Sequence, residues 1–238
     1  MSVVVNHLGV RLELDPKVIS DKMIENIRTG KYENAEAREI NRIIQPGEVV
    51  VEIGAGIGFI STLIAKHDNT VRVVSYEANP KLIGHIVKTL ENNTDKTRKN
   101  WEIRNAILKN GSEEESVDFY VHNDFWASSL LPIKDAASIE QVKVENFNQM
   151  LRDIKPTMIV CDIEGGELDL FKNADPRGSL AANVGSATVR SLSNMPLAEL
   201  LEDRHRMSRT VRLPLLPTLE GATEAAIDAA LKHAGLLN

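Results

Sequence analysis

The sequence predicts an α/β fold in which a doubly wound, mostly parallel sheet carries helices on both faces. Between Gly47 and Phe171, short apolar runs bounded by turn-forming residues alternate with longer segments of helical spacing. This alternation is typical of successive β-α-β units. One of the apolar runs also leads directly into three alternating glycines and then into an apolar helical segment, as in a nucleotide-binding β-α unit.

The first two β-α units follow from the spacing of their apolar residues. Residues 49–53 are a mainly apolar strand, and residues 57–66 place three apolar side chains on one helical face. Residues 71–76 form the second strand, and a helix begins at Pro80 because proline is tolerated at a first helical position. Later elements are expected as strands at 101–107, 117–122, around 142–144 and at 158–161, with a helix over 147–154.

The composition of the chain changes after Phe171. No aromatic residue follows, arginine nearly replaces lysine, and alanine, leucine and proline become frequent. We therefore expect an N-terminal segment (1–45) that packs on the core, a core over 46–174, and an atypical, divergent helical C-terminal segment (175–238). The strand candidates in that last segment, at 186–192 and 210–216, are weak.

The net charge, the cysteine count and the apolar runs of the 238 residues exclude several classes of partner and site. The formal net charge of −6 leaves no basic excess to neutralise phosphates, so we expect neither a nucleic acid nor a membrane as partner. Cys161 is the single cysteine, so an internal disulfide and a multi-cysteine metal site are excluded, and we assign no metal. The chain shows neither a secretory signal nor an apolar run long enough to span a bilayer, which favours a cytoplasmic location.

A glycine-rich turn joins the first predicted strand to its helix. Glu52 precedes it, and the turn contains Gly54, Ala55, Gly56 and Gly58. Glycine allows a tight turn and lets the backbone approach a ligand without a side chain between them. The alternative is a turn that merely joins strand to helix.

The cofactor follows from the surroundings of this turn. Glu77 closes the second strand 25 residues after Glu52, where an acidic side chain accepts hydrogen bonds from ribose hydroxyls; alternatively, it is an exposed carboxylate at a helix start. The glycines do not follow the G-x-G-x-x-G spacing of dinucleotide sites, and an acidic residue before the turn suits an amino group and a sulfonium better than a pyrophosphate. The sequence therefore favours S-adenosylmethionine.

Three segments carry a resemblance to a known family: 45–58, 76–80 and the carboxylate-rich segment 162–167. In order and spacing they resemble the FkbM family of S-adenosylmethionine-dependent methyltransferases, over roughly residues 30–172. Tyr32, Glu33 and Glu36 resemble the family's element before the first strand.

The resemblance implies a class I, Rossmann-like methyltransferase fold and a set of cofactor contacts. It implies O-methylation of a hydroxyl on a small molecule or sugar. The implied cofactor contacts are Glu52, Gly54, Gly56 and Gly58 around the methionine part, Glu77 on the ribose, and Asn105 and Ala106 near the adenine. Tyr32, Ala55, Ala78 and Asp162 are further cofactor contacts that the resemblance implies.

Methyl transfer to a hydroxyl requires a group that removes a proton. Asp162 and Glu164 are candidates because they follow a central strand, beside the crevice where open α/β sheets bind ligands. Capping of a helix would also explain these carboxylates. His122 is the third candidate, because its ordinary pKa lies near neutrality.

The loop that follows His122 interleaves aromatic and polar residues. Phe125 and Trp126 stand at its centre, a composition suited to closing over a small ligand. Packing of the two rings against the rest of the protein is the other reading.

Three functional readings follow from these motifs. The first is a methyltransferase, and the second is an inactive module that binds S-adenosylmethionine and uses its C-terminal segment for partner binding. A nicotinamide-dependent oxidoreductase is disfavoured by the glycine spacing. The acceptor and the oligomeric state, including a homo-oligomer, are left open.

Overall fold

The computed structural model describes residues 2–98, 100–163, 170 and 209–211, and the account below concerns these residues. Its centre is a five-stranded sheet of order β10-β9-β3-β4-β5. The strands are β3 (Glu48–Ile53), β4 (Thr70–Glu77), β5 (Trp101–Asn105), β9 (Met158–Cys161) and β10 (Arg209–Val211). The first four run parallel, and β10 runs antiparallel to β9. This arrangement confirms the predicted α/β fold with a mostly parallel sheet.

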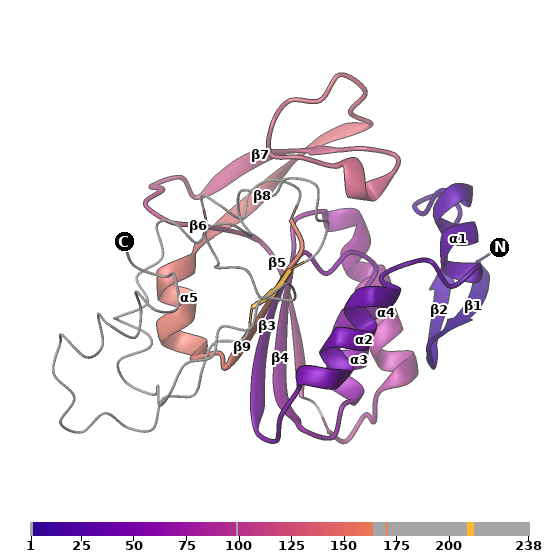
Figure 1. Cartoon of the computed structure of the whole chain (residues 1–238). Helices are drawn as coiled ribbons and strands as arrows, with labels where there is room; N and C mark the ends of the chain where they lie inside the picture. Colours follow the sequence, from indigo (N-terminus) through magenta and orange to yellow (C-terminus); the bar gives the residue numbers. More distant parts are fainter. Residues whose placement is uncertain (1, 99, 164–169, 171–208, 212–238) are drawn as a thin grey trace, which may run out of the picture.

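The sheet is covered by helices on both faces because its strands are apolar on both faces. On one face α2 (Asn34–Ile43), α3 (Phe59–Lys66) and α4 (Pro80–Asn93) pack against the strands, and on the other lies α5 (Phe147–Ile154) (Figure 1). Consecutive strand residues alternate between the two cores, as the two-residue period of a strand requires. Val50 and Val73 join the first core, whereas Val51 and Val74 join the second.

The N-terminal segment forms structure of its own that the sequence pattern did not indicate. β1 (Val3–His7) and β2 (Val10–Leu14) make an antiparallel hairpin, and α1 (Asp21–Arg28) follows it. The hairpin turns at Leu8 and Gly9, both with positive φ, the geometry that matches the twist of two-residue hairpins. Leu12 and Leu14 are buried in the same core as α3. The segment is therefore an integral part of the domain.

A separate three-stranded sheet, β6-β8-β7, lies above the carboxyl end of the central sheet (Figure 1). It contains β6 (Ile107–Lys109), β7 (Ser116–Val121) and β8 (Ser138–Asn146). β7 pairs antiparallel with β8, and a bridge between Tyr120 and Ser129 extends its far edge. The strand predicted at 101–107 is thus divided between two sheets, and the one predicted around 142–144 is nine residues long.

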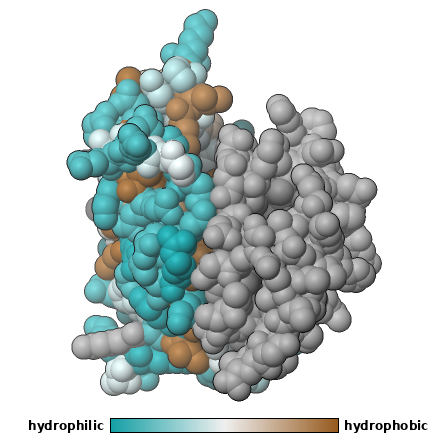
Figure 2. Space-filling model, turned by 90° about the vertical axis from the view of Figure 1, so that its left-hand side faces the viewer, coloured by the Kyte–Doolittle hydropathy of each residue, from teal (hydrophilic) through white to brown (hydrophobic). Residues whose placement is uncertain are grey.

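On one side of the molecule, the surface formed by the described residues is mostly polar. Figure 2 shows the side of the molecule on which α5 lies, where hydrophobic residues form small separate groups among hydrophilic ones. No helix in the described residues is long and apolar enough to cross a membrane. The cytoplasmic location stays a prediction.

Helix α5 begins at a side-chain cap whose loss has a measurable cost. The Asn146 side chain accepts a hydrogen bond of 2.8 Å from the backbone N–H of Gln149. We expect Asn146→Ala to lower the free energy of unfolding by about 1 kcal/mol, because one N–H at the helix start loses its partner. Urea denaturation measures this change. Asn146→Asp keeps an acceptor and should stay close to the wild type; equal losses in both variants would contradict the capping role.

Candidate functional site

The glycine turn lies at the carboxyl end of β3, between β9 and β4. The N–H groups of Gly54 and Ala55 both donate to the carbonyl of Tyr76, over 2.9 and 3.0 Å. Gly54 has φ +91°, and a Cβ atom there would lie 2.0 Å from the carbonyl oxygen of Asp162. A side chain therefore cannot be accommodated at this position without moving β9.

The middle of the turn faces two aromatic side chains. At Gly56, with φ +55°, a Cβ atom would lie 3.2 Å from the Tyr32 hydroxyl and 3.5 Å from Cε2 of Phe125. Gly58 then caps the start of α3. Backbone atoms of the turn are thus bordered by Tyr32 and Phe125.

Glu77 ends β4 beside the turn. One carboxylate oxygen accepts from the Gly56 N–H and the other from the Asn79 N–H, each over 2.7 Å. Burial raises the pKa of Glu77 to about 7, and these hydrogen bonds oppose that rise. A carboxyl group with this pKa changes charge near neutral pH.

Glu52 lies beneath the turn, buried between β3 and α3. Its carboxylate accepts a short hydrogen bond from the Ser61 hydroxyl. Burial raises the pKa of Glu52 to about 7, and the neighbouring Glu77 charge adds to the rise. Two acidic groups therefore share this part of the interior.

Tyr32 and Glu33 enter the site from the loop before α2. Desolvation first, and then the charges of Asp162 and Glu52, raise the pKa of Glu33 well above its ordinary value. The same charges contribute, after desolvation and the Glu33 carboxylate, to the raised pKa of the Tyr32 phenol. Tyr32, Glu33, Glu52 and Asp162 are thus close enough to act on one another electrostatically.

His7 of the N-terminal hairpin holds Tyr32 in place, a role that the sequence analysis did not predict. Its Nε2 donates to the Tyr32 carbonyl over 2.8 Å. The rings of His7 and Tyr32 also both lie against Phe59, with centroid separations of 4.7 and 5.9 Å. A histidine near the start of a chain carries no local signal for such a contact across 25 residues.

The predicted catalytic residues have different surroundings. Asp162 is half-buried at the end of β9, where its N–H donates to the Ile53 carbonyl over 2.9 Å. Glu164 lies outside the described residues. Nδ1 of His122 lies 2.9 Å from the Asp124 N and 3.2 Å from the Asp124 carbonyl oxygen. Asp162 is the described candidate that lies against the glycine turn.

The residues expected near the adenine lie next to Glu77. Asn105 pairs with Glu77 between β5 and β4, and its side chain donates to the carbonyls of Glu77 and Ala78 over 2.8 and 3.0 Å. Ala106 is buried in the core on the α5 side. Asn105 thus orders the loop after β4, and contact of these residues with a base stays a prediction.

The arrangement suits a cationic nucleoside. A backbone turn without side chains offers close approach, and the buried carboxylates favour positive charge and hydroxyl donors. Among the described residues, no group of three or more His, Cys, Asp or Glu side chains could hold a metal ion.

Comparison with known proteins identifies the kind of domain. Residues 4–114 match the TRM5/TYW2 methyltransferase domain. The matched stretch includes the N-terminal hairpin, the glycine turn, Glu77 and Asn105. Together with the sheet, this match gives a class I methyltransferase fold with S-adenosylmethionine as cofactor. The matched model is not that of the FkbM family, so the predicted resemblance holds at the level of S-adenosylmethionine-dependent methyltransferases.

The sequence similarity to individual curated proteins covers only short stretches of the chain. A 4-hydroxy-tetrahydrodipicolinate synthase of Agrobacterium fabrum is 77% identical over 31 residues, which are 13% of this chain and 10% of that enzyme. The Rhizobium meliloti enzyme of the same name is 73% identical over 33 residues, 14% of this chain and 11% of that enzyme. The chain thus spans about a tenth of the length of these relatives.

Two solved structures from Pyrococcus horikoshii are distant neighbours. Transferase PH0793 is 23% identical, with a TM-score of 0.35 over 44% of this chain and 36% of that one. TYW2 in complex with MeSAdo is 16% identical, with a TM-score of 0.39 over 89% of this chain and 69% of that one. Likenesses of this size carry no argument of their own.

The family match corrects the expected partner. Net charge predicted no nucleic acid, and the FkbM resemblance implied a small-molecule or sugar acceptor. Methyltransferases of the TRM5/TYW2 type act on tRNA, so both expectations were wrong. The physical reason is that net charge describes the whole chain, whereas phosphates are bound by local groups.

The glycine turn gives a first test. A methyl group added by Gly56→Ala would occupy the space below Tyr32 and Phe125 in a backbone conformation that L residues rarely adopt. We expect S-adenosylmethionine to bind at least tenfold more weakly, as measured by calorimetric titration. The control is Gly84→Ala in α4, where a Cβ atom meets nothing within 4 Å. It should raise stability by about 0.5–1 kcal/mol and leave binding unchanged; equal binding by both variants would refute the role of the turn.

The pKa of Glu77 gives a second test. Ribose hydroxyls donate to the ionised carboxylate of Glu77. Because the pKa of Glu77 is about 7, this ionised form predominates above pH 7. We expect the Kd for S-adenosylhomocysteine to rise up to tenfold for each pH unit below 7, as measured by calorimetry. Glu77→Gln should bind more weakly at pH 8 and lose much of this dependence.

Ionisation of Glu77 should strengthen cofactor binding but lower the folding stability of the protein without cofactor. The folded-state pKa of Glu77 exceeds the ordinary value of 4.5, so the folded protein binds the proton more tightly than the unfolded chain. The contribution of Glu77 to the free energy of unfolding is therefore fully present below pH 4.5 and is lost as the pH rises through 7.

For the binding test, a Kd for S-adenosylhomocysteine that is constant between pH 6 and 8 would exclude Glu77 from the ribose site.

Proposed function

We propose that the protein transfers a methyl group from S-adenosylmethionine to a nucleotide base of tRNA. The match of residues 4–114 to the TRM5/TYW2 methyltransferase domain carries the proposal. The geometry supports it, because the same residues supply the open turn and the carboxylate of Glu77.

In this proposal each described side chain has a limited role. Glu77 would bind the ribose hydroxyls, and the backbone of Gly54 to Gly58 would border the methionine part. A positive charge beside Glu52 and Glu33 would favour their ionised forms, against the burial that raises their pKa values. The bound cofactor supplies an electrophilic methyl group on a sulfonium, whose sulfur keeps the bonding electron pair. Asp162 accepts the proton that the acceptor atom loses, because it lies beside the turn at the end of β9.

The resemblance of residues 162–167 to the FkbM family supports a more detailed proposal. In it Glu164, two residues after Asp162 in the sequence, is a second proton acceptor. A comparison of Asp162→Asn and Glu164→Gln in cofactor binding and in turnover would assign the two roles.

The test is methyl transfer to RNA. The protein is incubated with total tRNA and S-adenosylmethionine labelled in its methyl group, and the RNA is then digested to nucleosides and analysed by mass spectrometry. We expect label on a base, at least a hundredfold above Glu77→Ala, since that variant loses its ribose contact. Label on the ribose would refute the base as acceptor, and binding of cofactor without any labelled RNA would refute tRNA methylation.

One observation favours a second candidate function, a non-catalytic module that binds S-adenosylmethionine. β10 runs antiparallel to β9, where a doubly wound sheet that continued through another β-α-β unit would place a parallel strand. Strands beyond β9 would help to wall the acceptor site, so a changed neighbour could preserve cofactor binding and remove turnover. Cofactor binding with no transfer to RNA, protein or small hydroxyl acceptors would support this candidate.

A further inference from the structure

The loop between β7 and β8 presents an aromatic pair in a fixed conformation. Phe125 and Trp126 form the short helix η1 (Phe125–Ala127), with their rings 5.5 Å apart and nearly perpendicular. The Ser128 hydroxyl accepts from the His122 N–H over 3.0 Å, and the Asp124 N–H is bound by the His122 ring. The loop is thus tied to the end of β7 on both sides of the pair.

Phe125 is the member of the pair that reaches the cofactor site. Its Cε2 lies 3.5 Å from the position of a Cβ atom on Gly56. Both rings are half-buried and pack against the core that contains α3. Packing accounts for part of each ring, and Phe125 lies beside the glycine turn.

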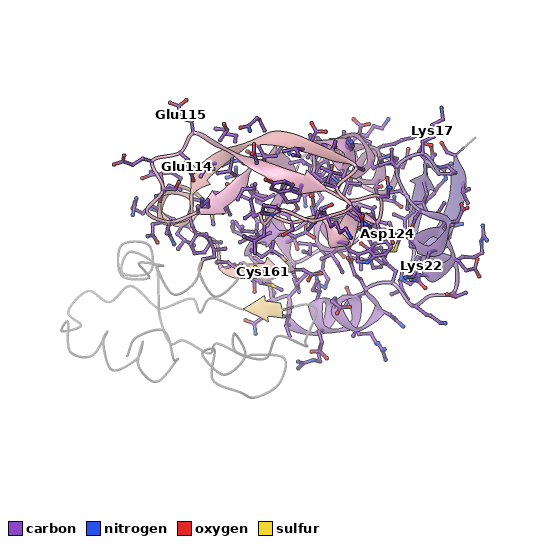
Figure 3. The ribbon with its side chains drawn as sticks, turned by 90° about the horizontal axis from the view of Figure 1, so that it is seen from above. Lys17, Lys22, Glu114, Glu115, Asp124 and Cys161 are labelled. Atoms are coloured by element: carbon purple, nitrogen blue, oxygen red, sulfur yellow. The ribbon has the colours of Figure 1, made fainter. Side chains whose placement is uncertain are left out.

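A cation stands next to the same pair. Nζ of Lys22, on α1, lies 5.8 Å from the centre of the Trp126 ring, within the range of a cation–π contact. In Figure 3, Lys22 and Asp124 lie at one end of the molecule, with Lys17 nearby, and Glu114 and Glu115 lie at the opposite end. Lys22 thus lies on the side of the molecule where η1 approaches α1.

An aromatic ring beside a lysine is suited to a nucleotide. Bases in single-stranded RNA stack on aromatic side chains, and phosphates pair with lysine. A protein segment would require hydrogen-bonding edges here, and a membrane would require a broad basic surface. The ring at the turn and the ammonium next to it match one unpaired nucleotide better.

We propose that the acceptor RNA lies across η1 and α1, with its target base against Phe125 and a neighbouring phosphate on Lys22. Trp126 acts as a positioning residue, since it contacts both Phe125 and Lys22. The proposal rests on the proposed function and names the acceptor subsite of the same site. It involves no covalent step beyond methyl transfer.

Binding measurements test the stacking role. The full chain is saturated with S-adenosylhomocysteine, and its Kd for fluorescently labelled tRNA is measured by anisotropy. We expect Phe125→Leu to bind tRNA about tenfold more weakly, in the range of the loss of one base–aromatic stack. Phe125→Tyr should restore binding. Circular dichroism should show that all three proteins are folded, and saturation with S-adenosylhomocysteine removes any effect of the ring on cofactor affinity from the comparison.

The salt dependence tests the phosphate contact. Lys22→Gln should reduce the slope of log Kd against log salt by about 0.7–0.9, the contribution of one phosphate. The matched control is Lys96→Gln, an exposed lysine after α4 at the opposite end of the sheet, which should keep the wild-type slope.

The possible failures are distinguishable. Wild-type tRNA binding in Phe125→Leu and an unchanged salt slope in Lys22→Gln, with the wild type methylating tRNA, would overturn the subsite alone. A wild type that binds the cofactor but neither binds nor methylates tRNA would overturn the proposed function.

Discussion

The close approach of β9 to the glycine turn is the constraint on which the rest of the site depends. A Cβ atom at Gly54 would lie 2.0 Å from the Asp162 carbonyl oxygen, so β3 and β9 can remain paired to their ends only with glycine there. That pairing puts Asp162 beside the turn, while the Tyr76 carbonyl holds the turn from the β4 side. The N–H of Gly56 then points at Glu77. One missing side chain thus sets the relative positions of three strand ends.

Much of the central sheet could be predicted because its signals are local. The apolar run at β3, the glycines after it and Pro80 at the start of α4 each act within a few residues. The positions of Glu77 and Asp162 follow as well, because parallel strands end at the same edge. Roles at the cofactor for these residues are still proposals, and Glu164 lies outside the described residues.

The remainder depends on contacts between distant residues or on properties that are not local. The hydrogen bond from His7 to Tyr32 spans 25 residues, and the register of β7 with β8 spans a loop of mixed composition. The partner was predicted wrongly because a net charge of −6 describes the whole chain, whereas phosphates are bound by local groups. A resemblance over the core also cannot identify an acceptor that lies outside it.

The antiparallel pairing of β10 with β9 covers an edge of the central sheet that could otherwise pair with strands of other molecules. β9 is a run of four buried residues, Met158 to Cys161, and its far edge is occupied by residues 209–211. A chain that ended before these residues would leave the backbone donors and acceptors along that edge unmet, next to an apolar strand. Such an edge recruits strands from other molecules. Residues 209–211 therefore protect this edge of the sheet from intermolecular pairing.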